Sequence, residues 1–400
     1  LIGPWFNDWI EPYAVADQSF HHGPVIDGWP LTWSLMEGPE GLTLDAGNGN
    51  LYWEPTQAQS GYHTVYLQAY NALGMAEGSL SIYVDQFPIE SQSHNNSNVA
   101  MDVFNNGSLG RTKGDNSYPG FLYNGQDGLW EAALMIGVDP DSVSGTLYRH
   151  EFATRSLVTD VESSFSGFDQ AFLAEYDDSR SHNSIGIHVN QRSHTKSFEP
   201  DNDYVLLDYE LVNISGQDLS EVYVGLAMDW DVGDYNMNSG GYDTTRSLSY
   251  VYENQDGSIS RIAALNDEDI QVAKMKKSSA GRNSRNMPYY YGAAALNANV
   301  SGHSIEFDNS DQSDSTLYYR MTHFESNDGI GEVRAYLSVG PFSIPADSSV
   351  NALFALIGGE DLADLQANAD AAFLVGPDTT DYWYVSTDGS DIAGDGSEEH

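Results

Sequence analysis

The residues with the clearest chemistry lie between positions 229 and 243 and are rich in side-chain oxygens. They follow an apolar run that ends at Met228, and glycines at positions 233, 240 and 241 allow tight turns. Ca²⁺ prefers oxygen ligands of this kind, although the spacing is not that of an EF-hand loop. The pattern predicts a Ca²⁺ site, and a polar loop with capped turns is the alternative. Its candidate ligands are Asp229, Asp231, Asp234, Asn236, Asn238 and Asp243.

Aromatic residues are the second set of candidates, with 25 Tyr, 15 Phe and 8 Trp in the chain. Aromatic ring faces stack on the apolar faces of sugars. The run Tyr289, Tyr290 and Tyr291 therefore predicts a glycan-stacking platform, and core aromatics of a sandwich are the alternative. A single basic patch at residues 274–285 predicts pairing with an acidic neighbour, and so self-association.

Known catalytic motifs are absent from the sequence. It contains no G-x-S-x-G, H-E-x-x-H, Walker A or G-x-G-x-x-G segment. A glycosidase needs only two suitably spaced carboxylates, so a polysaccharide-cleaving activity is the enzymatic alternative. We predict that the chain is not an enzyme.

The charge of the chain excludes several classes of partner. Its 400 residues include 59 acidic and 16 basic side chains, which gives a formal net charge of −43. Such a field repels nucleic-acid phosphates and anionic membrane surfaces. No apolar run approaches the length of a membrane span, so we expect no membrane insertion. Without cysteine there is neither a disulfide framework nor a thiolate metal site.

Strand patterns dominate the elements that must position these residues. Apolar or alternating runs lie between turn-forming pairs such as Asn106-Gly107 and Asp127-Gly128. Short strands at this spacing predict an all-β fold of sandwiches. One helix is expected over residues 360–373, and the acidic segment 308–314 is expected to be a solvated loop. The clearest strands are residues 65–70, 80–84, 204–212, 221–228, 247–252 and 333–339.

Shifts in composition predict three segments. Residues 1–86 form an Ig-like sandwich, residues 87–376 a larger all-β sandwich, and residues 377–400 a linker with the start of another element. Trp33 and Trp53 are the large core candidates of the first segment. The chain begins at Leu1 without a signal peptide, so we expect a processed or excised piece of a larger protein.

The first segment resembles the cadherin-like Ig repeats of bacterial surface proteins over residues 4–85. The resemblance rests on Leu31-Thr32-Trp33-Ser34-Leu35, on Gly49-Asn50-Leu51-Tyr52-Trp53 and on residues 65–74. It implies a sandwich fold and a spacer or adhesion role.

The other two segments also resemble modules of secreted bacterial proteins. The middle segment resembles an all-β module that often accompanies proteases and carries no catalytic role of its own. The resemblance rests on residues 120–123, 128–131, 134–137, 223–226, 229–234, 241–243 and 338–342. The tail from Tyr382 to Asp391 looks like the opening strand of a right-handed parallel β-helix.

Together these patterns predict a non-catalytic extracellular or cell-surface bacterial module that presents neighbouring domains or serves adhesion. A carbohydrate-binding module and a subunit of a self-assembling filament or sheath are the alternatives. The expected partners are neighbouring domains of a larger protein, a second copy of the chain, or glycans.

Overall fold

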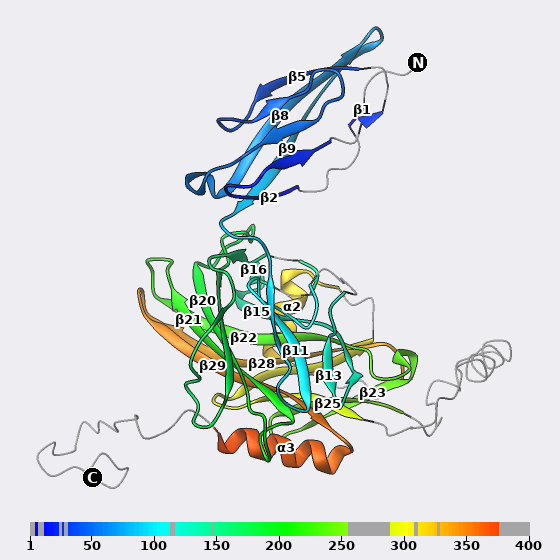
Figure 1. Ribbon diagram of the computed structural model, residues 1–400, viewed down its shortest axis with the longest axis vertical. Helices are drawn as coiled ribbons and strands as arrows, with labels where there is room; N and C mark the ends of the chain where they lie inside the picture. The colour runs from blue at the N-terminus through cyan, green and yellow to red at the C-terminus, as the bar shows by residue number, and fades with distance from the viewer. Residues whose placement is uncertain are drawn as a thin grey trace, which may run out of the picture.

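The computed structural model is built almost entirely of β-strands (Figure 1). It describes residues 5–6, 12–23, 26–27, 31–112, 117–145, 147–149, 151–254, 289–307, 311–325 and 329–375. The predicted all-β fold is therefore confirmed. The basic patch at 274–285 and the tail at 377–400 lie outside the described residues.

The strands up to Asp85 pair only among themselves in the described part of the chain and form what we call the N-terminal sandwich (Figure 1). A four-stranded sheet has the order β2-β9-β8-β5, with β2 parallel to β9, and faces a three-stranded sheet of order β3-β7-β6. Their bounds are β2 Tyr13–Val15, β9 Gly74–Asp85, β8 Gly61–Asn71, β5 Thr32–Glu37, β3 Phe20–His22, β7 Leu51–Trp53 and β6 Thr43–Leu44. A further pair joins β1 Trp5–Phe6 to β4 Ile26–Asp27, and a short 3₁₀ turn, η1, spans Gln57–Gln59.

The core of the N-terminal sandwich is built around the two tryptophans that the sequence suggests. Trp33 is 2% exposed and Trp53 is 4% exposed, and both pack with Leu51 and Leu67. Gly49 has a φ of 80°, and a Cβ there would lie 2.5 Å from the Trp33 ring. The Gly49 turn therefore needs glycine both for its backbone and for the space that the indole occupies.

The strands from Ser91 onward form what we call the large sandwich, which consists of two antiparallel-dominated sheets. Eleven described strands make the first large sheet, with the path β14-β13-β11-β12-β15-β22-β28-β26-β27 and with β10 and β16 beside it. Their bounds are β10 Ser91–His94, β11 Val99–Phe104, β12 Ser108–Leu109, β13 Phe121–Tyr123, β14 Gln126–Asp127, β15 Leu129–Asp139, β16 Ser142–Ser144, β22 Leu219–Trp230, β26 Val300–Phe307, β27 Phe324–Glu325 and β28 Val333–Ile344.

Nine described strands make the second large sheet, with the path β17-β19-β20-β21-β29-β25-β24-β23 and with β18 beside β19. Their bounds are β17 Ala153–Thr154, β18 Thr159–Asp160, β19 Gln170–Asp177, β20 Ile187–Thr195, β21 Tyr204–Asn213, β23 Asn238–Asp243, β24 Leu248–Glu253, β25 Tyr290–Ala295 and β29 Ser349–Gly359. The strands predicted at 204–212, 221–228 and 333–339 lie within these elements, and the one predicted at 247–252 matches β24 apart from its first residue.

Strand β29 shows why central segments read as unbroken apolar runs. Phe354 and Leu356 belong to the main core between the two large sheets. Ala355 and Ile357 point the opposite way and pack with residues of helix α3, Leu362–Leu374. Both faces of the strand are buried, so the alternation of apolar and polar residues disappears.

Helix α3 confirms the helix expected near the C-terminus, and it covers part of the outer face of the second large sheet (Figure 1). Its N-cap is Asp361, whose carboxylate accepts a hydrogen bond from the Asp364 N–H at 2.9 Å. This contact satisfies one of the N–H groups left open at the start of the helix.

Helix α2, Asp314–Thr322, is a second helix that the sequence analysis did not predict. Of the segment expected to be a solvated loop, residues 311–313 form the turn before this helix, and residues 308–310 lie outside the described residues. The helix begins at Asp314, and the Asp311 carboxylate accepts hydrogen bonds from Ser313 and Thr316 in the turn before it. Only Leu317, Arg320 and Met321 of the helix are buried, so the apolar periodicity was too weak to reveal it. A second 3₁₀ turn, η2, spans Tyr235–Met237, and no helix of the described residues could cross a membrane.

Candidate functional site

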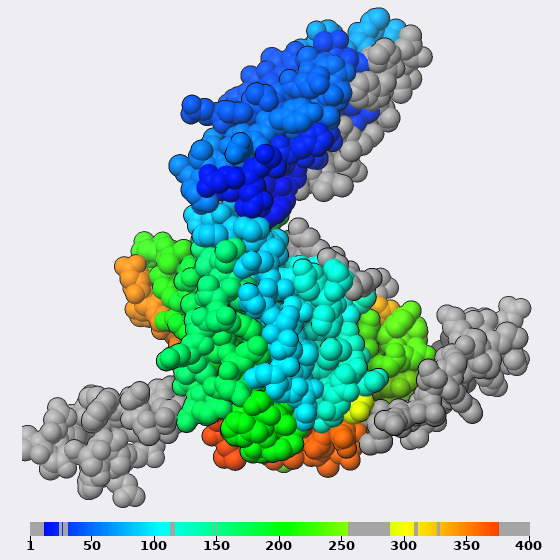
Figure 2. All heavy atoms as spheres, in the orientation of Figure 1, coloured from blue at the N-terminus to red at the C-terminus, as the bar shows by residue number. Residues whose placement is uncertain are grey.

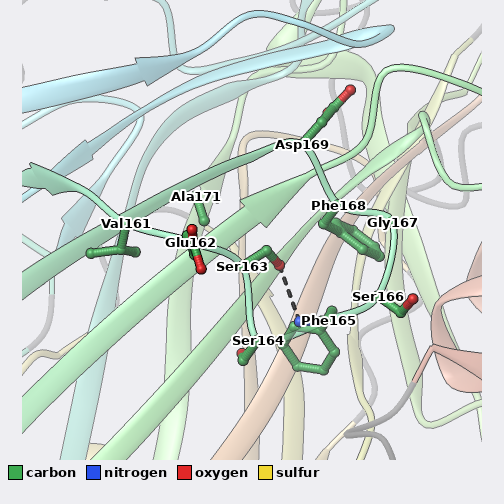
Figure 3. A pocket seen from close by; sticks show the side chains of 10 residues that line it. All are labelled: Val161, Glu162, Ser163, Ser164, Phe165, Ser166, Gly167, Phe168, Asp169 and Ala171. Carbon is green, nitrogen blue, oxygen red and sulfur yellow. Dashed lines mark hydrogen bonds between the residues drawn. The ribbon is translucent and has the colours of Figure 1, made fainter.

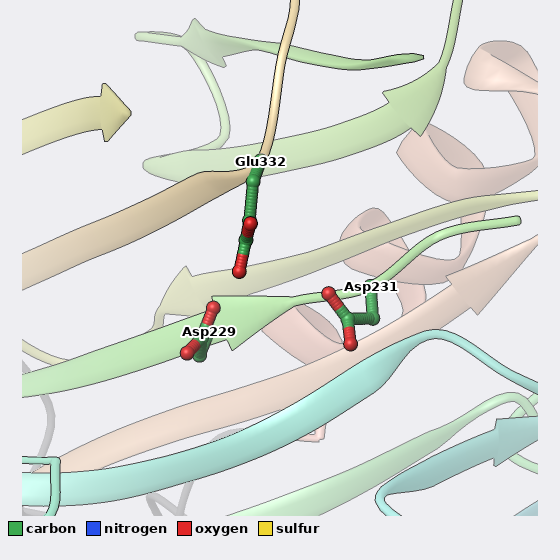
Figure 4. A group of neighbouring side chains, drawn as sticks. All are labelled: Asp229, Asp231 and Glu332. Carbon is green, nitrogen blue, oxygen red and sulfur yellow. The ribbon is translucent and has the colours of Figure 1, made fainter. Parts of the chain in front are cut away.

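Three carboxylates meet where β22 ends and β28 begins. Asp229 is the penultimate residue of β22, Asp231 follows that strand, and Glu332 immediately precedes β28 (Figure 4). One oxygen of each lies within 4.8 Å of the others. They come together because β22 and β28 are antiparallel neighbours with Trp230 opposite Val333. We call this set the carboxylate group.

Burial and mutual repulsion shape the electrostatics of the carboxylate group. Burial, followed by the nearby charges of Asp229 and Glu332, raises the pKa of Asp231 to about 6. Asp229 accepts a hydrogen bond of 2.7 Å from the Tyr148 hydroxyl and another from Arg334 at 3.4 Å. Burial, followed by the charge of Asp229, raises the pKa of Tyr148, so this phenol is a neutral donor.

The structure brings together only two of the six residues predicted to bind Ca²⁺. The Asp234 carboxylate accepts bonds from the backbone and side chain of Asn236, and it caps the turn η2. The buried Asn238 amide bonds both polar backbone atoms of Val232. These hydrogen bonds fix the loop after β22. Asp234, Asn236 and Asn238 therefore hold turns in place, which is the alternative to Ca²⁺ binding for these residues.

Asp243, the last of the six, lies at the far end of β23. Its carboxylate accepts hydrogen bonds from Arg246 at 3.0 Å and from Gln366 of α3 at 2.8 Å. These contacts connect the second large sheet to the helix and direct the side chain away from the carboxylate group. The six predicted ligands therefore do not surround one cation. Cation binding by Asp229 and Asp231 stays a prediction.

Sequence reasoning missed Glu332, Tyr148 and Arg334. None of them is near position 229 in the chain, and no local motif marks them. Strand pairing places Arg334 directly opposite Asp229, and the Arg334 guanidinium lies 5.6 Å from the centre of the Tyr148 ring. Only the register of β22 against β28 could have revealed this neighbourhood.

The carboxylate group offers two kinds of chemistry. Three oxygens at this spacing provide part of the coordination shell of a hard divalent cation. A carboxyl group whose pKa is near 6 is also better suited to proton transfer near neutral pH than an ordinary aspartate. A polysaccharide-cleaving enzyme would in addition need a cleft that holds the substrate against two such groups.

Two cavities of the described residues lie away from the carboxylate group. One, of about 520 Å³, is formed by the loop at 161–171 (Figure 3). There Ser163 Oγ lies 2.9 Å from His194 Nδ1 and accepts a hydrogen bond from the Phe165 N–H. Burial lowers the pKa of His194 to about 4, and its Nε2 makes no hydrogen bond in the described part of the chain. A serine nucleophile needs a base oriented by a third group, so this pair does not form a triad.

The second cavity, of about 610 Å³, lies beside β10 and β11. The buried acid Asp102 lines it, and burial raises the pKa of this carboxyl, while Ser93 and Ser91 oppose the shift by donating hydrogen bonds to it. Neither cavity is lined by the carboxylate group.

The predicted tyrosine platform at 289–291 is wrong as a single surface. Tyr291 is 1% exposed and points between the large sheets, where its hydroxyl donates to the Gln126 carbonyl at 2.9 Å. Tyr290 points the opposite way and stacks on Tyr252 with ring centres 4.8 Å apart. Consecutive strand residues face opposite sides of a sheet, so the three rings cannot present one plane.

Comparisons with known proteins give no family. No family model matches the chain, and no curated protein is significantly similar to it. A solved structure of a Bacteroides fragilis protein assigned as an α-galactosidase is 31% identical over 20% of this chain and 17% of that one, with a TM-score of 0.20. A titin M10–obscurin-like 1 Ig complex matches at 20% identity over 22% of this chain and 97% of that one, with a TM-score of 0.17.

A polysaccharide lyase aligns over more of the chain, with 12% identity, 71% of this chain, 34% of that one and a TM-score of 0.27. The chain thus spans about a sixth of the length of the galactosidase and a third of the length of the lyase. At these TM-scores the likenesses support no functional conclusion.

A buried ionic contact joins the two sandwiches. Asp85, the last residue of β9, is fully buried, and its carboxylate lies 3.6 Å from the Arg180 guanidinium of the large sandwich. The Thr154 N–H donates to the same carboxylate at 3.1 Å. The Arg180 guanidinium also lies over the rings of Tyr13 and Tyr83, at 5.3 and 5.4 Å from their centres. Burial raises the pKa of Asp85 to about 6, although Arg180 opposes the shift.

Hydrogen bonds surround this contact. The Tyr62 hydroxyl donates to the Arg180 carbonyl at 2.7 Å, and the hydroxyls of Tyr83 and Ser179 lie 2.9 Å apart. The connecting residues 86–90 are also held, because Thr154 bonds both polar backbone atoms of Phe87. We call this set of contacts the joint. Figure 2 shows that the two sandwiches meet over a narrow area, so the joint carries much of their contact.

Proposed function

We propose that this chain is a non-catalytic structural module of a larger extracellular or cell-surface protein. In this role the large sandwich holds the N-terminal sandwich in a fixed orientation and thereby sets its distance and direction. The joint is the observation that supports the proposal. A flexible tether would leave its connecting residues solvated. The connection here is short, spans residues 86–90, is held by hydrogen bonds and lies beside a buried ion pair.

The energetics of the joint favour one orientation. Removing one partner of a buried ion pair leaves an uncompensated charge, which costs about 3 kcal/mol. Separation of the sandwiches would also expose the Tyr13 and Tyr83 rings that pack around Arg180. The aromatic and ionic contacts therefore act together, and each opposes rotation about the connection.

Small-angle X-ray scattering tests the proposal. The wild-type chain should scatter as one elongated particle with a single orientation of its two sandwiches. Arg180→Ala should broaden the distribution of interatomic distances, because Asp85 then loses its cation. Arg192→Ala is the matched control, since Arg192 lies on β20 and its partner Glu210, at 3.7 Å, belongs to the same sheet. Wild-type scattering that requires an ensemble of independent orientations would refute a rigid module.

A further inference from the structure

Three exposed tyrosines lie on one face of the N-terminal sandwich. Tyr62, Tyr66 and Tyr70 are 38%, 46% and 42% exposed, and all three belong to β8. The residues between them on the opposite face, such as Val65 and Leu67, are fully buried. Residues an even number apart on a strand share a face, so the rings form a row. We call it the tyrosine row.

The tyrosine row runs along a central strand, with β5 paired on one side and β9 on the other. Pairing places Ser79 beside Tyr66, and Thr32 and Met75 on either side of Tyr70. Because β8 is paired on both sides, the sheet surface extends beyond the row in both directions and can support an extended ligand. A steady repeat of four residues separates the tyrosines by about 13 Å.

Polar side chains separate the rings. Thr64 and Gln68 lie between the tyrosines on the same face, and the Gln68 amide donates to Glu77 at 3.0 Å. The described residues of β2, β5, β8 and β9 include no lysine or arginine. Around Tyr66 and Tyr70 an anionic ligand would therefore meet carboxylates such as Glu37 and Glu77, and the net charge of −43 would repel it further.

We propose that this face binds a neutral polysaccharide laid along β8, with the Tyr66 and Tyr70 rings stacked on sugar rings. Ring faces supply apolar contact to pyranoses, and the hydroxyl and amide groups between them supply hydrogen bonds. The regular alternation of ring and polar group suits a ligand that repeats along its own length. A protein partner would instead need a contiguous apolar centre, which the interposed Thr64 and Gln68 interrupt.

Tyr62 has a different part in the row. Its hydroxyl bonds the Arg180 carbonyl, and its ring stacks near His182 at 5.9 Å, so it belongs to the joint as well. The row thus leads from the free end of the N-terminal sandwich toward the large sandwich, along the direction of β8 in Figure 1. A bound polysaccharide would be guided toward the junction of the two sandwiches.

Affinity electrophoresis of the full chain in gels containing xyloglucan, hydroxyethylcellulose or laminarin tests this proposal. At least one of these neutral polymers should retard the wild-type chain, whereas the anionic polymer alginate should not. The double variant Tyr66→Ala/Tyr70→Ala should bind about a hundredfold more weakly, at about tenfold for each stacked ring. Tyr66→Phe should retain binding because it keeps the ring.

Tyr52→Ala is the matched control, since Tyr52 is 44% exposed but belongs to β7 in the opposite sheet. It should bind as the wild type does, and circular dichroism should show all variants folded. Absence of retardation by all three neutral polymers would overturn the proposal. Concentration-dependent dimerisation of the wild-type chain that disappears in the double variant would also overturn it, because the face would then be a protein interface. Neither outcome affects the scattering test of the joint.

Discussion

At the scale of single residues, burial decides the ionisation of the two most unusual acids. Asp85 and Asp231 both have a pKa raised to about 6, and in each case burial is the largest cause. Arg180 faces Asp85 and opposes the shift, whereas Asp231 lies beside two further carboxylates. Asp85 is therefore part of a structural contact. Asp231 lies among carboxylates that repel one another, and a bound cation would relieve this repulsion.

The calcium prediction can be tested at this scale by thermal melts. Ca²⁺ at about 1 mM, a concentration suited to extracellular sites, should raise the melting temperature, and EDTA should reverse the rise. Glu332→Gln should abolish the Ca²⁺-dependent rise, because Glu332 completes the carboxylate group. Asp243→Asn should retain it, since the Asp243 carboxylate bonds Arg246 and Gln366 instead. Identical melts of the wild type with and without Ca²⁺ would contradict the prediction.

At the scale of elements, helices α2 and α3 cover parts of the outer faces of the large sandwich. Helix α2 is anchored by Arg320, which is 3% exposed and forms two hydrogen bonds of 2.6 Å to the Glu306 carboxylate of β26. The same guanidinium lies 4.6 Å from the centre of the Tyr336 ring on β28. It also donates a hydrogen bond to the Asp311 carbonyl at 2.7 Å, so one planar side chain joins helix and sheet through three kinds of partner.

Replacing Arg320 with lysine should show how much this anchor contributes. Lysine cannot form the paired hydrogen bonds or the flat stack, so we expect Arg320→Lys to lower the free energy of unfolding by about 2 kcal/mol. Arg246→Lys is the control, because Arg246 forms a similar pair with Asp370 of α3 in an exposed setting, where the change should be much smaller. Equal effects of the two substitutions in urea melts would show that burial of the Arg320 pair does not matter.

At the scale of the whole molecule, the excess of 43 negative charges opposes compaction. Described arginines form ion pairs with nearby acids, as Arg111 does with Asp127 and Arg149 with Glu151 and Asp314, and these pairs neutralise charge only locally. Most carboxylates therefore repel one another across the surface. Dissolved counterions are the remaining source of screening for such a chain.

Salt should therefore stabilise the chain. Raising NaCl from about 0.1 M to about 1 M shortens the screening length from about 10 Å to about 3 Å. We expect the melting temperature to rise over this range at pH 7.5. The rise should nearly vanish at pH 4, close to the sequence isoelectric point of about 4.1, where the net charge is small. An equal rise at both pH values would attribute the effect to something other than charge screening.

The sequence by itself determined the features that depend on neighbouring residues. Alternating runs predicted β21, β22, β24 and β28, because side chains of a strand alternate between its faces. The apolar spacing after Asp361 predicted α3, and the bulky Trp33 and Trp53 marked the core of the N-terminal sandwich. Each of these signals is contained in a short stretch of chain.

Only the tertiary structure decided which distant residues meet. Asp231 and Glu332 lie 101 positions apart and approach because β22 pairs with β28, a register that no local pattern specifies. The contact of Asp85 with Arg180 depends likewise on how two separate sandwiches dock. The tyrosine row is visible as an alternation in sequence, but the exposure of Tyr66 and Tyr70 depends on how β8 packs in the N-terminal sandwich, with only its inner face in the core. Long-range pairing and docking arise from the packing of the whole chain, so they cannot be derived from any one segment.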